Sequence, residues 1–248
     1  MVFGLLLGAW SLVPGGSGVT DLPSPARVLR AFVDLLEVPP GERVPRLLAY
    51  AIASVFRVTW GFVLAATLAI PLGLLMGWYQ RVFWALNPLV QILRPISPIA
   101  WIPVAILLVR NDDPRSILLI FVSTFFPIVV TTAAAVRAIP PVYVRAAANF
   151  GCRGSLLFRK VILPATLPQI MTGLRIAAGV AWLVVVAAEM IAIDSGLGYL
   201  IIDARNAGGR YDRIVAAMLT IGAIGLALDT VLRRLERGDR VKWGQARG

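Results

Sequence analysis

VTWGFVLAATLAIPLGLLMG, residues 58–77, is a run of twenty residues without a charged side chain. A hydrocarbon layer roughly 30 Å thick is crossed by a helix of about 20 apolar residues, so this stretch predicts a transmembrane helix. Apolar stretches of similar length recur along the chain, at residues 84–109, 116–137, 166–192 and 214–232, and a shorter one lies near residues 2–14. The sequence therefore predicts an all-α, polytopic membrane helix bundle with about six transmembrane helices.

The composition supports a membrane protein and excludes several other classes. Hydrophobic residues make up 58% of the 248-residue chain and charged residues only 15%, whereas about 25% of the residues in soluble domains are charged. Histidine is absent and Cys152 is the only cysteine, which excludes a histidine proton relay, a cysteine–histidine metal site and an intrachain disulfide. The net charge of +11 comes from scattered arginines instead of one basic face, so no nucleic-acid partner is expected.

The chain is predicted to form one transmembrane domain over residues 1–248, with a helical core at about 47–235. Neither an internal repeat nor a second soluble domain is visible in the sequence. The longest polar connection, residues 15–46, contains a segment in which apolar residues recur at helical spacing: Val28, Leu29, Phe32, Leu35 and Leu36. This spacing predicts an amphipathic helix at the membrane interface.

The distribution of basic residues predicts the orientation. Residues 78–83, 137–165 and 229–248 together hold 12 Lys/Arg and 3 acids, whereas residues 15–46, 110–115 and 193–213 hold 9 Lys/Arg and 9 acids. Cytoplasmic loops of membrane proteins carry the excess of Lys and Arg. The first set of loops is therefore predicted to be cytoplasmic.

Residues 142–168 (VYVRAAANFGCRGSLLFRKVILPATLP) separate two predicted spans and are too basic to lie within the bilayer. The three alanines at 146–148 favour a short helix, and Gly151 permits a sharp corner. Residues 155–161 can then resume the helix before Pro164. The segment predicts a helix–glycine–helix element held at the cytoplasmic surface.

This element resembles the coupling loop of binding-protein-dependent ABC importer permeases, here at about residues 142–165. The family pattern is Glu-Ala-Ala, three residues, Gly, nine residues, then Ile-x-Leu-Pro. The matching residues of this chain are Ala146, Ala147, Gly151, Leu163 and Pro164, with Val161 in place of Ile and Arg145 at the position of the Glu. By this resemblance these seven residues form the contact with an ATPase.

The resemblance extends over much of the chain, including SGLGYLI (195–201), and is to the nitrate, sulfonate and taurine branch. RPISPIAWIP (94–103) is most similar to nitrate and bicarbonate permeases. The resemblance implies a five-helix core plus one extra helix, a homodimer, two cytoplasmic ATPase subunits and an extracytoplasmic substrate-binding protein or domain, in the bacterial cytoplasmic (inner) membrane. The expected solute is a small anion, with nitrate, nitrite or bicarbonate first and alkanesulfonate or taurine next.

This chain is not expected to be an enzyme. It lacks the GxxxxGK[ST] phosphate loop, so the resemblance implies that ATP and Mg bind to the partner ATPase, and no cofactor, metal or catalytic residue is expected here. A self-sufficient secondary transporter or channel is the alternative, and it predicts transport without an ATPase. A membrane-embedded enzyme would need convergent nucleophile, base or metal ligands, which isolated acids do not provide.

Candidate pathway residues are the polar or aromatic ones within the spans: Gln91, Arg94, Ser97, Trp101 and Glu189. The prolines on either side of Ser97 predict a sharp bend, which either lines a pathway or only packs. Arg94 either adds positive potential to an anion pathway or pairs with Glu189, and the ion pair is the favoured reading.

Three other charged positions have simpler interpretations. Arg57 is predicted to be an interfacial anchor, and Arg175 is predicted to extend its side chain to the membrane surface. Asp112 and Asp113 are predicted to lie in a tight, solvated turn, not in a metal site.

Overall fold

The computed structural model describes residues 23–38, 40–41 and 43–242, and all regular elements in these ranges are helical. The stretch near residues 2–14 that was predicted as a short span lies outside them. The elements are α2 (Pro25–Leu36), α3 (Arg46–Trp78), α4 (Gln80–Leu93), the 3-10 helix η1 (Pro98–Trp101), α5 (Ile102–Leu108), α6 (Asp112–Arg137), α7 (Pro141–Asn149), α8 (Gly154–Leu157), the π-helix η2 (Phe158–Ile162), α9 (Leu163–Ala192), α10 (Leu197–Asn206) and α11 (Tyr211–Lys242).

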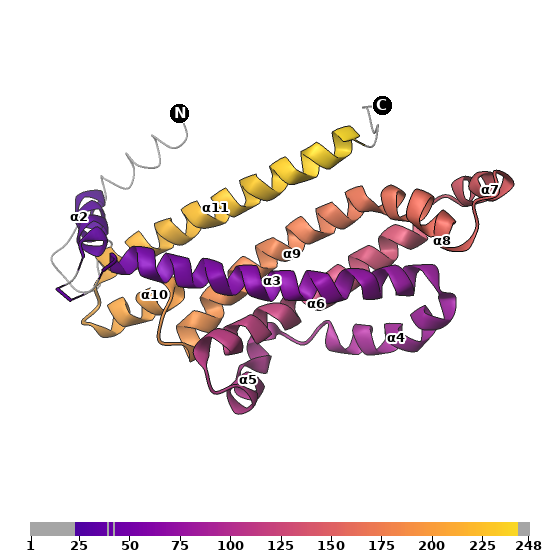
Figure 1. The fold of residues 1–248 in the computed structure, drawn as a ribbon. Helices are drawn as coiled ribbons and strands as arrows, with labels where there is room; N and C mark the ends of the chain where they lie inside the picture. The colour runs from indigo at the N-terminus through magenta and orange to yellow at the C-terminus, as the bar shows by residue number, and fades with distance from the viewer. Residues whose placement is uncertain (1–22, 39, 42, 243–248) are drawn as a thin grey trace.

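Four long helices run lengthwise through the molecule: α3, α6, α9 and α11 (Figure 1). Each contains a segment long and apolar enough to cross a membrane, which confirms four of the predicted spans. The predicted span 84–109 is instead broken into α4 and η1–α5, which meet at 88°. The predicted bend is therefore confirmed, but the segment is not one continuous helix.

A strip of small residues lets α3 lie directly against α6. Residues 61, 65, 69, 73 and 77 are all Gly or Ala and recur every fourth position on one face of α3. A Cβ atom added to Gly73 would lie 2.6 Å from the Cβ of Thr132, and one added to Gly77 would lie 2.5 Å from the Cβ of Val136. Because lipid tails do not drive apolar helices together, this close backbone approach provides the packing energy between them.

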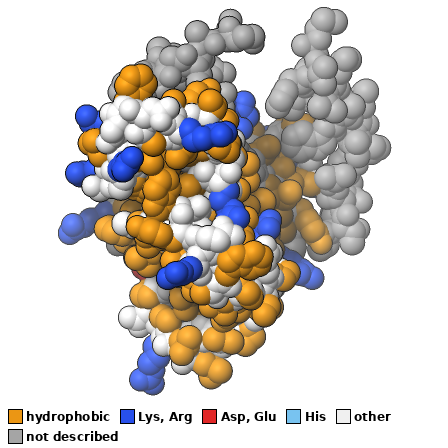
Figure 2. Space-filling view, turned by 90° about the vertical axis from the view of Figure 1, so that its right-hand side faces the viewer, with side chains coloured by type: hydrophobic (Ala, Val, Ile, Leu, Met, Phe, Trp, Pro, Cys, Tyr) orange, Lys and Arg blue, Asp and Glu red, His pale blue; other side chains and the backbone are white. Residues whose placement is uncertain are grey.

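The two sets of loops that the charge count separated lie at opposite ends of the molecule. α2, α10 and the α5–α6 connection gather at one end, here called the outer end, and α7, α8 and the last turns of α11 gather at the other, the inner end (Figure 1). Figure 2 looks onto the inner end, where basic side chains are interspersed with hydrophobic ones and acidic side chains are nearly absent. This distribution is the one expected of a cytoplasmic face.

The predicted amphipathic helix is confirmed as α2. It buries Val28, Ala31 and Leu35 against the rest of the protein and leaves Leu29 66% exposed. Val28 and Leu35 belong to the same hydrophobic cluster as Trp182 of α9. α2 is therefore an integral part of the outer end of the bundle.

Candidate functional site

The inner end carries the predicted helix–glycine–helix element. α7 ends in a Schellman motif: the Gly151 N–H donates to the Ala148 carbonyl at 3.0 Å, and the Cys152 N–H donates to the Ala147 carbonyl at 3.0 Å. Gly151 has φ +78°, which L side chains rarely adopt. The chain then enters α8 and η2, so the predicted corner at Gly151 is confirmed.

The base of this element is anchored, while its tip is exposed. Leu157 and Ile162 are buried, and the ring of Phe158 packs edge-on against Trp78 at the end of α3, with centroids 5.9 Å apart. By contrast, none of the residues of α7 is buried, and Phe150 is 87% exposed. The base of the element is therefore joined to the inner ends of α3 and α9.

The seven residues predicted to contact an ATPase are distributed along this element in chain order. Arg145, Ala146 and Ala147 lie on α7, Gly151 forms the corner, Val161 lies in η2, and Leu163 and Pro164 begin α9. The side chains of Arg145 and Leu163 are exposed. The structure thus places them along one continuous inner-end element.

A second unusual feature is the break between α4 and α5. α4 begins next to the inner end of α3 and rises about 21 Å over its 14 residues. Figure 1 shows the break beneath the middle of α3 and not at either end of the bundle. The break therefore lies between the two ends of the bundle, within the length of α3.

Polar side chains surround this break and are exposed on the isolated chain. The side chains of Gln91, Arg94 and Ser97 are all exposed. A charged arginine facing lipid at the centre of a membrane helix costs about 2.5–3.5 kcal/mol on insertion scales. This face is therefore expected to be covered by another chain or to line a polar pathway.

Trp101 differs from the other three candidates near the break. Its side chain packs against the cluster formed by α5, α6 and the end of α9, which includes Ile102 and Ala188. Its indole N–H is buried and has no hydrogen-bond partner within the described ranges. Trp101 therefore packs the bend against α6 and α9 and does not face outward as Gln91, Arg94 and Ser97 do.

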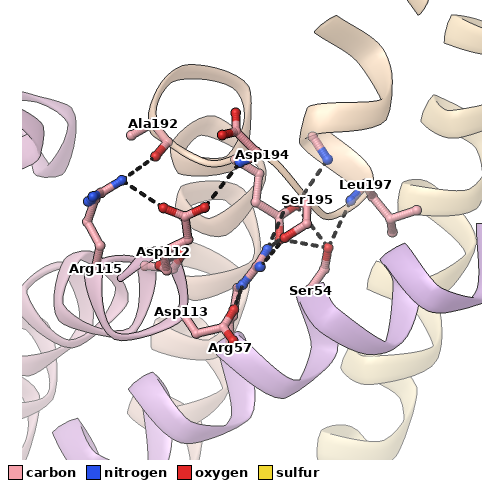
Figure 3. A network of polar contacts seen from close by, with 12 residues as sticks. Ser54, Arg57, Asp112, Asp113, Arg115, Ala192, Asp194, Ser195 and Leu197 are labelled. Atoms are coloured by element: carbon pink, nitrogen blue, oxygen red, sulfur yellow. Dashed lines mark hydrogen bonds and ion pairs between the residues drawn. The ribbon is translucent and has the colours of Figure 1, made fainter. Parts of the chain in front are cut away.

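Glu189 lies elsewhere, in a buried network at the outer end. Figure 3 shows other members of this network, including Ser54, Arg57 and Ser195. It is 1% exposed, and Arg57 on α3 is 2% exposed. The Arg57 guanidinium donates to the Glu189 carboxylate at 2.8 Å and, through Nε, to Asp113 at 2.7 Å. The Ser54 hydroxyl and the Gly198 N–H also donate to Glu189, at 2.8 and 3.0 Å.

The loop between α9 and α10 wraps around this carboxylate. Arg57 donates to the backbone carbonyl of Ser195 at 2.9 Å and to its hydroxyl. Gly196 has φ +105°, and a Cβ atom there would lie 2.2 Å from the carboxyl carbon of Glu189. Only glycine fits at this position, so the loop sequence and the buried ion pair depend on each other.

A neighbouring arginine fastens the other outer loops. Arg115 donates to the Ala192 carbonyl at the end of α9 at 2.7 Å, to the Val109 carbonyl after α5 at 3.3 Å, and to Asp112 at 3.0 Å. A cation at the carboxyl ends of two helices interacts favourably with their dipoles. Together with the Arg57 network, this contact joins α3, α5, α6, α9 and α10.

Several predictions about charged residues are wrong. Glu189 pairs with Arg57 and not with Arg94, and Arg57 is a buried partner instead of an interfacial anchor. Asp113 lies in the first turn of α6, where it contacts Arg57. Arg175 was predicted only to extend its side chain to the membrane surface, but it forms an ion pair with Glu236 of α11 at 2.9 Å.

Arg57, Ser54 and Gly198 are members of this site that the sequence pattern did not predict. A signal was present, because Glu189 is the only acid between residues 114 and 193. A buried acid in a span requires a partner, and the basic candidates were Arg94 and Arg175 within predicted spans and Arg57 directly before one. The pattern gave no means of choosing between them.

Comparison with known proteins identifies the family. Residues 69–240 match the family model described as the binding-protein-dependent transport system inner membrane component. The chain belongs to this family. The permease is 37% identical to the nitrate import permease protein NrtB of Leptolyngbya laminosa over 94% of this chain and 83% of the relative.

Two further relatives support this assignment. The bicarbonate transport system permease protein CmpB of Synechococcus elongatus is 37% identical to the permease, over 95% of this chain and 86% of its own length. A protein of Methanocaldococcus jannaschii, provisionally named an ABC transporter permease, is 44% identical over 77% of this chain and 71% of its own. These matches confirm the expected nitrate and bicarbonate branch.

A solved structure shares the fold of the permease. It is a chain of the MetNI methionine ABC transporter in an inward-facing conformation, with a TM-score of 0.68 and 16% sequence identity. The match covers 78% of the permease and 96% of that chain. The permease is therefore a multi-pass membrane protein with the fold of an ABC importer transmembrane subunit.

Proposed function

We propose that two identical copies of the permease form the translocation pathway of an ATP-driven importer in the bacterial inner membrane, with the outer end facing the substrate-binding protein or domain. Two separate ATPase subunits bind ATP and Mg and hydrolyse the nucleotide. The exposed helix–glycine–helix element at the inner end is the single observation that carries this proposal. A rigid, anchored element with an exposed apolar tip suits a protein partner that pushes or pulls on it.

Coupling is proposed to run through the seven residues that lie along this element: Arg145, Ala146, Ala147, Gly151, Val161, Leu163 and Pro164. Because Ile162 is buried and Pro164 begins α9, a displacement of α7 passes directly into a long span. The pathway is proposed to pass the α4–α5 break, beside Gln91, Arg94 and Ser97. The permease domain extends beyond the family match to include α2 and all of α3.

The transported solute is proposed to be a small anion. Nitrate, nitrite or bicarbonate is favoured because relatives of 37% identity carry nitrate and bicarbonate names, and alkanesulfonate or taurine comes next. The charge pattern supports an anion, since residues 43–111 and 114–188 contain no acid. Uptake of nitrate, bicarbonate and taurine in competition by the reconstituted complex would rank these solutes.

The importer assignment is tested by purifying the tagged chain from its native host. An ATPase subunit should co-purify, and uptake into proteoliposomes should require ATP. Transport by the permease alone would instead establish a secondary transporter or channel and overturn the assignment.

The coupling role is tested with Gly151→Pro, which removes the N–H bonded to Ala148 and excludes a positive φ. We expect the ATPase to dissociate or its hydrolysis to become independent of uptake. Gly209→Pro is the matched control, because Gly209 has φ +72° and donates to Arg205 at 3.1 Å, but lies at the outer end. Equal loss of the ATPase in both variants would contradict a specific coupling role, as would unchanged uptake in the Gly151 variant.

A further inference from the structure

Among the described residues, the charge of Arg94 has no ion-pair partner, and it lies at the α4–α5 break, between the two ends of the bundle. It is the C-cap residue of α4, directly before the break, and its side chain is exposed. Gln91 lies one helical turn earlier on the same face, and Ser97 is the exposed N-cap residue of η1. The break thus presents a guanidinium, an amide and a hydroxyl near one another.

No acidic side chain of the described part of the chain pairs with Arg94. The acid expected to do so, Glu189, is fully engaged by Arg57, Ser54 and Gly198. A second copy of the chain repeats residues 43–111, which contain α3, α4 and α5 without any acid, so this part of it brings another Arg94 and no carboxylate.

The break that carries Arg94 lies between the two ends of the bundle, away from the loops at either end. Arginines near helix ends extend to the interface, but those near the centre face the interior of the assembly or a water-filled cavity. A cation without a carboxylate partner in such a cavity attracts anions to it. In an importer, the mobile anion available at this depth is the solute itself.

We propose that Arg94 binds the transported oxyanion halfway along the pathway, with Ser97 and Gln91 as neighbouring hydrogen-bond donors. The second copy completes the site by contributing its own Arg94. This inference rests on the proposed importer function, and it makes Arg94 a residue that determines the preference for anions.

The chemistry of the side chain narrows the class of ligand. A guanidinium presents parallel N–H donors in one plane, and these match two coplanar oxygens of a carbonate-like or nitrate-like ion. A lysine ammonium provides the same charge but no planar fork. The site should therefore favour planar oxyanions over spherical halides, and this preference should depend on arginine.

The first test measures ATP-driven nitrate uptake by the complete reconstituted complex carrying Arg94→Met, Arg94→Lys or the control Arg110→Met. Arg110 is also an exposed arginine, but it lies in the outer-end connection before α6. We expect Arg94→Met to keep its ATPase partner and lose about tenfold or more in uptake, as for the loss of a charge-assisted hydrogen bond. Arg94→Lys should retain more uptake but be inhibited more strongly by chloride. Arg110→Met should lose less uptake than Arg94→Met and should not change the inhibition by chloride.

The second test measures binding without transport. Cys152 is replaced by Ser and Arg94→Cys is introduced, so that a methanethiosulfonate reagent labels a single thiol. Nitrate or bicarbonate should slow the labelling of the assembled complex, and attachment of an aminoethyl group should restore uptake, whereas a neutral methyl group should not.

Outcomes that overturn the anion site are distinct from failure of the importer assignment. Wild-type uptake in Arg94→Met, labelling that no tested anion slows, or a failure of every Arg94 variant to assemble would each refute the site, the last by showing a structural role. Absence of an ATPase from the wild-type preparation would instead refute the proposed function.

Discussion

Removing Arg57 from the outer-end network should destabilise the permease more than removing Glu189. Arg57→Met leaves the 1% exposed Glu189 carboxylate without a cation, and an uncompensated buried charge of this kind costs about 3–5 kcal/mol. Glu189→Gln leaves Arg57 its 2.7 Å contact with Asp113, which limits the loss to about 2–3 kcal/mol.

The double variant separates the pair from its surroundings. Once Arg57 is gone, an uncharged amide at position 189 is preferable to a buried carboxylate. The two substitutions together should therefore cost about 2 kcal/mol less than the sum of the single effects, which lies within the range measured for residues in direct contact.

The assay is unfolding in mixed detergent micelles, followed by tryptophan fluorescence. Arg137→Met provides a control, because this exposed arginine lies over the Phe83 ring at 4.0 Å and bonds Gln80 at 3.0 Å. Its removal should cost about 1 kcal/mol or less. Additive effects of the Arg57 and Glu189 substitutions, or a loss in Arg57→Met no larger than the control, would refute the reasoning.

Three further substitutions test the packing of the helices. Gly198→Ala places a Cβ atom 2.3 Å from a carbonyl oxygen of α9 and should lower stability by at least about 2 kcal/mol, whereas Gly179→Ala, with open space around it, should be neutral; the yield of monodisperse protein in detergent compares them. Gly73→Val should separate α3 from α6 because its Cβ would overlap Thr132, and crosslinking between cysteines in the two helices should weaken. Trp182→Phe removes the 3.2 Å hydrogen bond to a carbonyl of α11 and should cost about 1 kcal/mol, seen as faster hydrogen exchange in α11; unchanged exchange would contradict this role.

The spans and the inner-end corner could be predicted because their signals are local. Span length follows from bilayer thickness, and the corner follows from Gly151 after a short run of alanines. The bend at the broken span was also visible, since Pro95 and Pro98 lie three residues apart. The 88° angle was not, because packing against neighbouring helices fixes the direction in which a bend points.

Partners across the bundle could not be predicted from the same patterns. Helical periodicity shows which residues share a face, but not which helix that face meets. Arg57 and Arg94 both lie in apolar surroundings, and only the fold shows that α3, not α4, passes beside Glu189.

One local signal was misread. Asn111, Asp112, Asp113 and Pro114 resemble a turn, but acids and proline are also enriched in the first turn of a helix. The structure begins α6 at Asp112. Recognising this start would have placed Asp113 at the outer end of a span, where Arg57 could reach it.

The two ends of the bundle differ in how firmly their helices are held together, and this difference determines how the bundle can move. At the outer end, arginines join five helices through hydrogen bonds and ion pairs, and along its middle α3 packs closely against α6. Under the proposed coupling, a force on α7 would act at the end of the bundle farthest from the outer-end network. The resulting displacement would be largest at α7 and smallest at the outer-end network. The α4–α5 segment lies between them and would move by an intermediate amount.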